Sequence, residues 1–373
     1  MPANLRIWRA CFALATAALT SGCSDTAYLL QSATGHITLL HAARPVDDWL
    51  GDDHTPAALK QRLQLAQDIR RFAIDTLHLP DNASYQRYAQ LPRRAVVWNV
   101  VAAPAYSLTL KTWCFPVTGC VGYRGYFEEA DAHALATALR GQGWEARVYG
   151  VPAYSTLGWT NWLGGDPLLS TFIDYPPDEL ARMLFHELAH QVLYIADDTA
   201  FNESFATAVE RLGGVAWLAH QGDAAARSQS SAAEERRRAF RALTARTRQT
   251  LQSIYALDRQ PQPTPTQLAA QKEAAYVEFR QSYARLREDW GGYNRYDAWV
   301  ASANNAAFGA LAAYDDWVDA FESLFHTQSG NWPDFYAAAR VLAALPRAER
   351  NAHLRHLQRL SAPNLPISYT NHR

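Results

Sequence analysis

The sequence lacks an excess of charge of either sign. It contains 35 lysine and arginine residues against 36 aspartate and glutamate residues, for a formal net charge of −1. Binding to nucleic acid depends largely on basic side chains that neutralise phosphates, so this balance gives no reason to expect a nucleic-acid partner. No internal repeat is evident, and a composition of 49% hydrophobic and 19% charged residues is typical of a globular protein rather than a disordered one.

Long apolar runs are also lacking, and the one near the N-terminus is short. Residues 11–20 (CFALATAALT) follow two arginines and are too few to span a bilayer comfortably, as in a signal peptide. The Ser-Gly pair directly before Cys23 resembles a bacterial lipobox, in which the cysteine is lipidated and becomes the new N-terminus. Thr20 stands where that pattern has leucine, which leaves an ordinary secretory signal as the alternative. We expect residues 1–22 to be a lipoprotein signal peptide and residues 23–373 to form a single domain.

Cysteine is scarce, at 4 residues. Cys11 leaves with the signal peptide, and serine in place of aspartate after Cys23 resembles an outer-membrane address in Gram-negative bacteria. We therefore expect a protein of the bacterial cell envelope, lipid-anchored on the periplasmic side of the outer membrane. In that oxidising compartment the remaining pair, Cys114 and Cys120, is expected to form a disulfide. The alternative is a metal site that takes its other two ligands from elsewhere.

The remaining patterns predict a chain of the α+β class that is predominantly helical, with one modest β-region. Apolar residues at helical spacing predict helices over residues 26–45, 56–77, 128–140, 177–197, 200–222 and 224–260. Runs of β-branched and aromatic residues predict strands over residues 94–104, 106–117, 122–127 and 144–151, of which the first two form a hairpin. We expect a β-containing part at about residues 90–220 and a helical C-terminal part at about residues 224–360.

One predicted helix combines apolar residues with a group of ionisable ones. It is expected to begin at Pro177 and to stop at Asp197, and its stretch MLFHELAHQVLY contains His186, Glu187 and His190. Ionisable groups are costly in an apolar helix unless something compensates them. Residues four positions apart lie roughly 40° apart around a helix, so the two imidazoles point the same way, and Glu187 lies about 100° from His186. This H-E-x-x-H arrangement is typical of two zinc ligands with a general base for water.

A catalytic zinc ion keeps three protein ligands and leaves one position for water, so the motif needs a third ligand. Glu203 lies 13 residues after His190, which leaves room for a turn and a return of the chain past the metal. Glu210 lies seven residues further, within about 20° of Glu203 on the same helix face. We predict Glu203 as the third ligand and Glu210 as the partner of a ligand histidine. The reverse assignment, with Glu210 as the ligand, is the alternative on spacing alone.

These motifs resemble those of known peptidases. H-E-x-x-H followed by Asn-Glu-x-Phe-Ala, here residues 202–206, is similar to the gluzincin metallopeptidases. Nearly all of the mature chain resembles a bacterial family of predicted aminopeptidases, many of them lipoproteins. The matching stretches are YLLQSATGHITLL, WCFPVTGCVGYRGYF, PAYSTLGW, DPLLSTFI, FHELAHQ, FNESFATAVE and NNAAFGALAAYDDWVDAFESLF. The resemblance implies a zincin-like core, with a small mixed β-sheet before the H-E-x-x-H helix, and hydrolysis of peptide bonds.

The sequence departs from the large gluzincin aminopeptidases at their Gly-x-Met-Glu-Asn substrate strand, because Met1 and Met183, its two methionines, lie in no such motif. The candidate substrate edge is instead residues 153–158, where an extended strand could pair with a peptide. Tyr154 in this edge either reaches the tetrahedral oxyanion or packs in the core. Further candidates for the oxyanion donor are Arg124, Asn304 and Tyr314. No residue is assigned to hold the α-amine of a substrate.

The resulting prediction is a Zn²⁺-dependent peptidase, an aminopeptidase by resemblance, in which Glu187 takes a proton from water and passes it to the leaving amine. Its expected partners are a peptide substrate and, through lipidated Cys23, a membrane, and the sequence does not determine its oligomeric state. The alternative is a zinc-stabilised, non-catalytic envelope lipoprotein that binds peptides or partner proteins and needs no base. A structural envelope protein without metal is a third interpretation.

Overall fold

Helices make up most of the protein. The computed structural model describes residues 28–115, 119–153, 156, 164–256 and 263–360. Residues 28–42 are helical, and the further helices are α2 (Val46–Gly51), α3 (Ala57–Asp75), α4 (Glu129–Gly141), α5 (Pro177–Val192), α6 (Thr199–Gln221), α7 (Ala224–Tyr255), α8 (Pro265–Asp289), α9 (Asp297–Ala301), α10 (Asn305–Asp315), α11 (Val318–Thr327), α12 (Trp332–Ala344) and α13 (Arg347–Leu360). The predicted predominance of helix is confirmed. None of the helices in these ranges is long and apolar enough to cross a membrane.

The strands of the described chain all precede α5 and form small sheets. They are β1 (Arg44–Pro45), β2 (Arg87–Ala89), β3 (Val97–Pro104), β4 (Trp113–Phe115), β5 (Gly119–Val121), β6 (Arg124–Tyr126), β7 (Trp144–Val151) and β8 (Leu168–Leu169). The sheet with the longest strands has the order β6-β3-β7 and is antiparallel throughout. The sheet β1-β2-β8 is mixed, and β4 pairs with β5.

The predicted hairpin between residues 94–104 and 106–117 is wrong. β7 occupies one edge of β3 along its whole length, and β6 occupies the other edge at Trp98–Val100. The segment that follows β3 contacts it through a backbone hydrogen bond of 2.7 Å from the N–H of Lys111 to the C=O of Ala102, without forming a strand there. Residues 105–112 form no strand, and only Trp113–Phe115 is extended, paired with Gly119–Val121. Strand-forming residues are visible in a sequence, whereas their partners are decided by contacts between distant segments.

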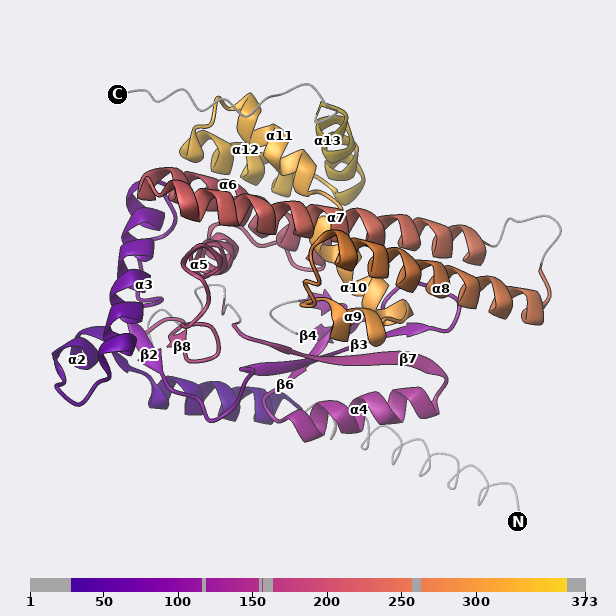
Figure 1. Ribbon diagram of the computed structural model, residues 1–373, viewed down its shortest axis with the longest axis horizontal. Coiled ribbons are helices and arrows are strands. Elements are labelled where there is room, and N and C mark those ends of the chain that lie inside the picture. Colours follow the sequence, from indigo (N-terminus) through magenta and orange to yellow (C-terminus); the bar gives the residue numbers. More distant parts are fainter. Residues whose placement is uncertain (1–27, 116–118, 154–155, 157–163, 257–262, 361–373) are drawn as a thin grey trace, which may run out of the picture.

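The sheet β6-β3-β7 is covered by helices on both faces. Val100 of β3 packs with Ala136 of α4 on one face. Because side chains alternate along a strand, the next residue, Val101, points the other way, where it packs with Ala306 of α10. Figure 1 shows α4 below this sheet and α10 above it, with α6 further above. The sheet therefore presents one face to the helices α10 and α6.

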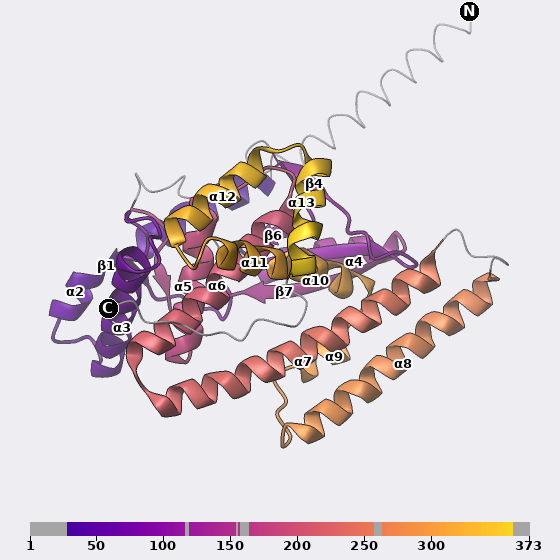
Figure 2. The same cartoon turned by 90° about the horizontal axis from the view of Figure 1, so that it is seen from above.

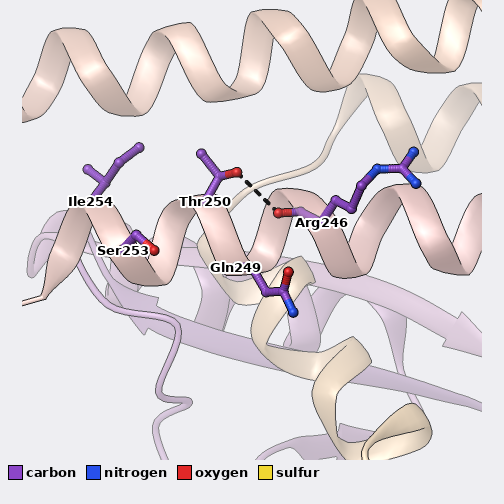
Figure 3. A pocket seen from close by; sticks show the side chains of 5 residues that line it. All are labelled: Arg246, Gln249, Thr250, Ser253 and Ile254. Carbon is purple, nitrogen blue, oxygen red and sulfur yellow. Dashed lines mark hydrogen bonds between the residues drawn. The ribbon is translucent and has the colours of Figure 1, made fainter. Parts of the chain in front are cut away.

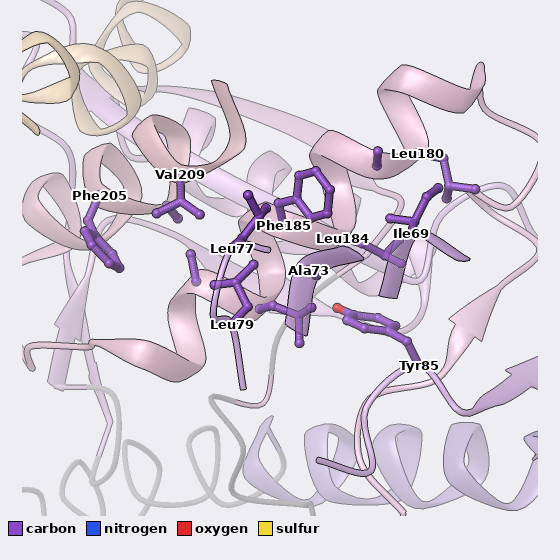
Figure 4. Packing of buried hydrophobic residues seen from close by; sticks show 14 of the residues in the cluster. Ile69, Ala73, Leu77, Leu79, Tyr85, Leu180, Leu184, Phe185, Phe205 and Val209 are labelled. Atoms are coloured by element: carbon purple, nitrogen blue, oxygen red, sulfur yellow. The ribbon is translucent and has the colours of Figure 1, made fainter. Parts of the chain in front are cut away.

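α5 lies in the main hydrophobic core. Its residues Leu180, Leu184, Phe185 and Leu188 recur every three or four positions and are at most 1% exposed. Figure 4 shows such side chains meeting residues of α3 and α6. Burial of each large apolar side chain contributes about 1.5–3 kcal/mol, so this packing fixes the position of α5 between its two neighbours.

The C-terminal helices cover the outer side of α6 (Figure 1). The ring of Phe205 on α6 lies 5.5 Å from that of Phe321 on α11 and 5.7 Å from that of Phe335 on α12. α6 is thus packed between α5 on one side and this helical layer on the other. Its rotation about its own axis is held from both sides.

α7 and α8 lie side by side and extend away from the rest of the molecule (Figure 2). α7 begins where the sequence predicts, but it is not solvated all round, because Phe240, Leu243 and Leu251 are buried against α8 and α9. Figure 3 shows a pocket on α7 whose lining residues are Arg246, Gln249, Thr250, Ser253 and Ile254. All of them belong to one helix, and none is a candidate site residue.

Candidate metal centre

α5 carries His186 and His190 one turn apart on the side that faces α6. The centroids of the two rings lie 4.9 Å apart, and the ring planes cross at 82°. His190 is 8% exposed. The helix geometry thus places both imidazoles next to each other in a largely apolar setting.

The segment between α5 and α6 determines how the second helix faces the first. α5 ends at Val192, several residues before the predicted stop at Asp197. Asn202, which is 2% exposed, explains the early end. Its amide oxygen accepts from the backbone N–H of Ile195 at 2.8 Å, and its amide nitrogen donates to the C=O of Ile195 at 2.7 Å. Asp198 then caps α6 by accepting a backbone hydrogen bond.

Glu203 follows Asn202 and lies about 100° further around α6, which turns its carboxylate to the histidines. Its Oε2 lies 3.4 Å from His186 Nε2 and 3.7 Å from His190 Nε2. One ligand atom from each of the three residues lies within 4.8 Å of the other two, and no second group of this kind occurs among the described residues. Zinc bonds of about 2.0–2.1 Å place the ligand atoms of a tetrahedron about 3.3 Å apart, so this donor set fits a four-coordinate ion.

A chain of alternating charges leads away from His186. Its Nδ1 lies 3.2 Å from Glu210 Oε2, and Glu210 Oε1 accepts from Arg182 at 2.9 and 3.0 Å. Arg182 also donates to Glu234 of α7 at 2.9 Å. A carboxylate at Nδ1 orients the ring, so that Nε2 is the nitrogen that faces Glu203. The Nδ1 of His190, by contrast, is buried and has no hydrogen-bond partner within the described ranges.

Burial and neighbouring charges give the site residues different protonation. Burial opposes a charge on His186, but the hydrogen bonds with Glu203 and Glu210 outweigh it and raise its pKa. Burial lowers the pKa of His190 to about 4, so this imidazole is neutral at pH 7. Burial also opposes a charge on Glu210, yet the hydrogen bond with His186 and the charge on Arg182 lower its pKa to about 2. The carboxylate beside His186 is therefore ionised.

Glu187 lies beside the metal-binding group without belonging to it. Burial raises its pKa to about 7, opposed by His186 and assisted by the charges on Glu203 and Asp166. A carboxyl group whose pKa lies near the working pH can both accept and return a proton. The electrostatics therefore suit the role of general base.

Three tyrosines from other elements lie within electrostatic reach of Glu203. They are Tyr123 between β5 and β6, Tyr149 on β7 and Tyr194 directly after α5. Burial raises the pKa of each phenol, and the charge on Glu203 raises it further, although a hydrogen bond with Asn99 lowers that of Tyr149. All three keep their protons and can donate hydrogen bonds. Sequence reasoning missed these roles, and the one available signal was the position of Tyr123 in the family-like stretch WCFPVTGCVGYRGYF.

The other predicted oxyanion donors have different surroundings. The Asn304 amide oxygen accepts from the backbone N–H of Ala307 at 3.0 Å, and its amide nitrogen donates to the C=O of Ala146 at 3.4 Å. Asn304 therefore caps α10 and ties it to β7. The Arg124 guanidinium lies 4.1 Å from the ring centroid of Tyr28. Outside the described part of the chain lie Cys23, Tyr154 and the side chain of Tyr314.

Cys114 and Cys120 form a disulfide across the β4–β5 hairpin. The backbone N–H of Cys120 donates to Asp197 Oδ1 at 2.5 Å. Gly119, at φ of 70°, lies so close to Asp197 that a side chain at this position would collide with it. Asp197 belongs to the segment between α5 and α6, so the hairpin holds the connection between the two helices that carry the candidate ligands.

Fold and site define a predominantly helical protein in which two packed helices hold two histidines and a glutamate that could bind a metal ion. The chain belongs to the family described as "Putative aminopeptidase", whose model matches residues 27–354. This range includes His186, Glu187, His190, Glu203 and Glu210, and the predicted resemblance to the aminopeptidase family is confirmed. Comparisons with curated proteins and with solved structures found no match. The name of the family indicates a peptidase.

Proposed function

We propose that this protein is a zinc-dependent peptidase of the gluzincin type, acting as an aminopeptidase, with a zincin-like core around α5 and α6. The observation that carries the proposal is the convergence of His186, His190 and Glu203, with Glu187 beside them. Structural zinc sites are closed by four protein ligands, whereas this group has three members among the described residues. The arrangement therefore favours a catalytic site over a purely structural one.

His186, His190 and Glu203 would hold the metal ion, because two imidazole nitrogens and one carboxylate oxygen are ligands that suit zinc. Bound there, zinc supplies Lewis acidity, which polarises a carbonyl and lowers the pKa of water towards 7. Glu210, itself held by Arg182, fixes the His186 ring so that Nε2 is presented to the site.

Glu187 moves the proton. It accepts a proton as water attacks the scissile carbonyl, and it donates that proton to the leaving amine, so that one peptide bond and one water give a carboxyl group and an amine. A pKa of about 7 allows both transfers near neutral pH. The residue lies about 100° around α5 from His186, which keeps its carboxylate out of the ligand group.

Tyr123 is the donor that we propose for the oxyanion. Its phenol stays protonated, because burial and the charge on Glu203 both raise its pKa. Its hydroxyl forms no hydrogen bond with another described residue, whereas Tyr149 is engaged by Asn99. A donor that stabilises the oxyanion lowers the barrier most when it is already in place. Tyr154 remains a second candidate from the sequence.

We also propose that the mature chain is lipidated at Cys23 and anchored on the periplasmic side of the outer membrane. The apolar run and the small residues before Cys23 support this location. The disulfide between Cys114 and Cys120 is in keeping with an oxidising compartment. The substrates would then be peptides of the cell envelope.

The substitution Glu187→Gln tests the proposed function. The wild-type protein should shorten peptides that have free N-termini, lose this activity with a chelator and regain it with zinc. Glu187→Gln should keep its zinc but lose turnover by about 10²–10⁴-fold, because only the proton transfer is removed. Digests of free and N-acetylated peptides read by mass spectrometry, together with elemental analysis, measure both quantities.

The matched control is Glu278→Gln, which changes an exposed glutamate of α8 and should leave zinc content and turnover unchanged. His186→Ala should lose both zinc and turnover. Full activity of Glu187→Gln would exclude Glu187 as the base. A wild-type protein that binds zinc but cleaves no peptide would instead be the non-catalytic envelope lipoprotein.

A further inference from the structure

β7 directs Arg147 to the same face of the sheet as Tyr149. Ala146 and Val148 pack against α4, so the alternate residues point away from α4 towards the helices on the other face. Glu145 confirms this direction, because its carboxylate accepts from the first backbone N–H of α10 at 2.7 Å. Arg147 therefore lies on the face of the sheet that also carries a tyrosine of the candidate site.

Arg147 is a half-buried cation without an anion. Its guanidinium lies 5.1 Å from the ring centroid of Trp299 on α9. Its Nη1 is buried and has no hydrogen-bond partner, and within the described ranges no carboxylate forms an ion pair with it. Burial lowers the pKa of the guanidinium, and Tyr149 is the neighbour that opposes this effect.

Arg124, which also has a buried, unbonded nitrogen, lies against the ring of Tyr28. Among the described residues, five further arginines of this kind differ from Arg147, because each has a carboxylate partner through another nitrogen. These arginines are Arg93, Arg211, Arg237, Arg248 and Arg350. A buried guanidinium is costly unless an anion compensates it. The uncompensated charge of Arg147 therefore suits an anion supplied by a ligand.

The position of Arg147 relates it to the metal centre. Two residues of strand separate Arg147 from Tyr149, about 7 Å at a rise of about 3.3–3.4 Å per residue. Tyr149 in turn lies within electrostatic reach of Glu203. Because an extended peptide has the same rise, a substrate that runs along β7 from the level of Tyr149 reaches the level of Arg147 two residues further on. A guanidinium stacked on an indole presents its planar edge to a carboxylate through two parallel hydrogen bonds.

We propose that Arg147, supported by Trp299, binds a substrate carboxylate that lies one or two residues beyond the scissile bond. The substrates would be di- and tripeptides with a free C-terminal carboxylate, or longer peptides with an acidic side chain at that position. The inference rests on the proposed function, since it assigns the substrate class of the same site.

Three forms of one tripeptide test the subsite: the free acid, the C-terminal amide, and an amide that has aspartate as its third residue. The wild-type kcat/KM should be about 10–100 times higher for the free acid than for the amide, because a charge-assisted pair is lost. A high kcat/KM for the aspartate amide would show that an acidic side chain also serves. A low kcat/KM would limit the subsite to the C-terminal carboxylate of a peptide substrate.

Arg147→Gln should lower kcat/KM for the free acid by about 10–100-fold and leave the amide unchanged, whereas Arg147→Lys should keep part of the preference. Arg236→Gln is the matched control, since that guanidinium lies 4.7 Å from the ring centroid of Tyr293 on a different part of the molecule and should not affect the preference. Equal kcat/KM values for acid and amide in the wild type, or equal losses on both in Arg147→Gln, overturn the proposal.

A binding measurement separates this proposal from the proposed function. Calorimetric titration of zinc-loaded Glu187→Gln with the acid and the amide repeats the comparison without turnover. If the acid binds about tenfold more tightly than the amide, the subsite is supported. If, in addition, the wild type cleaves neither peptide, only the proposed peptidase function fails. Equal affinities overturn the subsite.

Discussion

His186 lies between two carboxylates, and this pairing governs the behaviour of the site at the scale of single residues. Glu203 lies on its Nε2 side and Glu210 on its Nδ1 side. Glu210 is balanced in turn by Arg182, which also pairs with Glu234. Removal of one of these charged groups leaves a neighbouring buried charge without its partner, so each such substitution is expected to destabilise the fold.

Glu210→Gln should weaken metal binding without abolishing it. The variant keeps all three candidate ligands but removes the charge that orients the His186 ring, and loss of such a partner typically costs about 10–100-fold in metal affinity. Competition with a chromophoric chelator measures the affinity, with Glu278→Gln as the control. An unchanged affinity would contradict the orienting role, and a complete loss, as expected for His186→Ala, would make Glu210 a ligand.

At the scale of elements, the connection between α5 and α6 decides whether the ligands meet. Asn202 binds the backbone of this segment from within α6. The disulfide hairpin β4–β5 holds it at Asp197, and α13 holds it through an ion pair of 2.5 Å between Arg350 and Asp198. Two elements distant in sequence, the hairpin β4–β5 and α13, therefore act together with Asn202 of α6 to fix the angle at which Glu203 approaches the histidines.

Replacing both Cys114 and Cys120 by serine should lower the free energy of unfolding by about 2 kcal/mol, the loop-closure value for a short loop of sequence separation 6. Metal affinity should fall less than in Glu210→Gln, because Asn202 and α13 still hold the connecting segment. Denaturant unfolding and chelator competition give the two values. Reductant should reproduce the loss in the wild type and have no effect on the double variant, and an unchanged unfolding free energy would show that the hairpin does not brace the fold.

Element boundaries show which local features were predictable. The strand Trp144–Val151 and the start of α7 lie where the sequence patterns place them, because period and composition are local properties. The end of α5 was predicted too late, because the apolar period of the sequence continues past Val192. The hydrogen bond from the N–H of Ile195 to Asn202 joins the connecting segment to α6, and the local pattern does not reveal it. The predicted hairpin failed for the same reason, since β3 pairs with strands that follow much later.

At the scale of the whole molecule, the candidate site is built from two distant parts of the chain. The candidate ligands come from α5 and α6, and the proposed base comes from α5. Tyr123, Tyr149 and Arg147 come from the β-region that precedes these helices. The sheet β6-β3-β7 turns one face to the helices (Figure 1). Tyr123 and Tyr149 pack on this face with Ala306 of α10, and alternation along β7 directs Arg147 to the same face. The fold thus places the candidate metal centre of the helices on the side that one face of this sheet turns to them.

Cys23→Ala should release the protein from the membrane. Four residues separate Cys23 from the helix at residues 28–42, and each spans at most about 3.6 Å, so a lipid at Cys23 would hold the body close to the bilayer. The wild type should incorporate labelled palmitate and sediment with the outer membrane, whereas the variant should be unlabelled and soluble. A wild type that is soluble and unlabelled would indicate an ordinary secretory signal.

The sequence by itself determined which residues make up the candidate metal centre and which helices carry them. Helical period alone directs His186 and His190 the same way and places Glu203 and Glu210 on one face, because these relations extend over a few turns of backbone. Only the tertiary structure decided that Glu203 lies near both histidines, while Glu210 contacts the Nδ1 of His186 alone. It also decided that Tyr123 and Arg147 lie on the face of the sheet that packs against α10. Those relations depend on long-range strand pairing and helix packing, for which no local pattern in the sequence carries a signal.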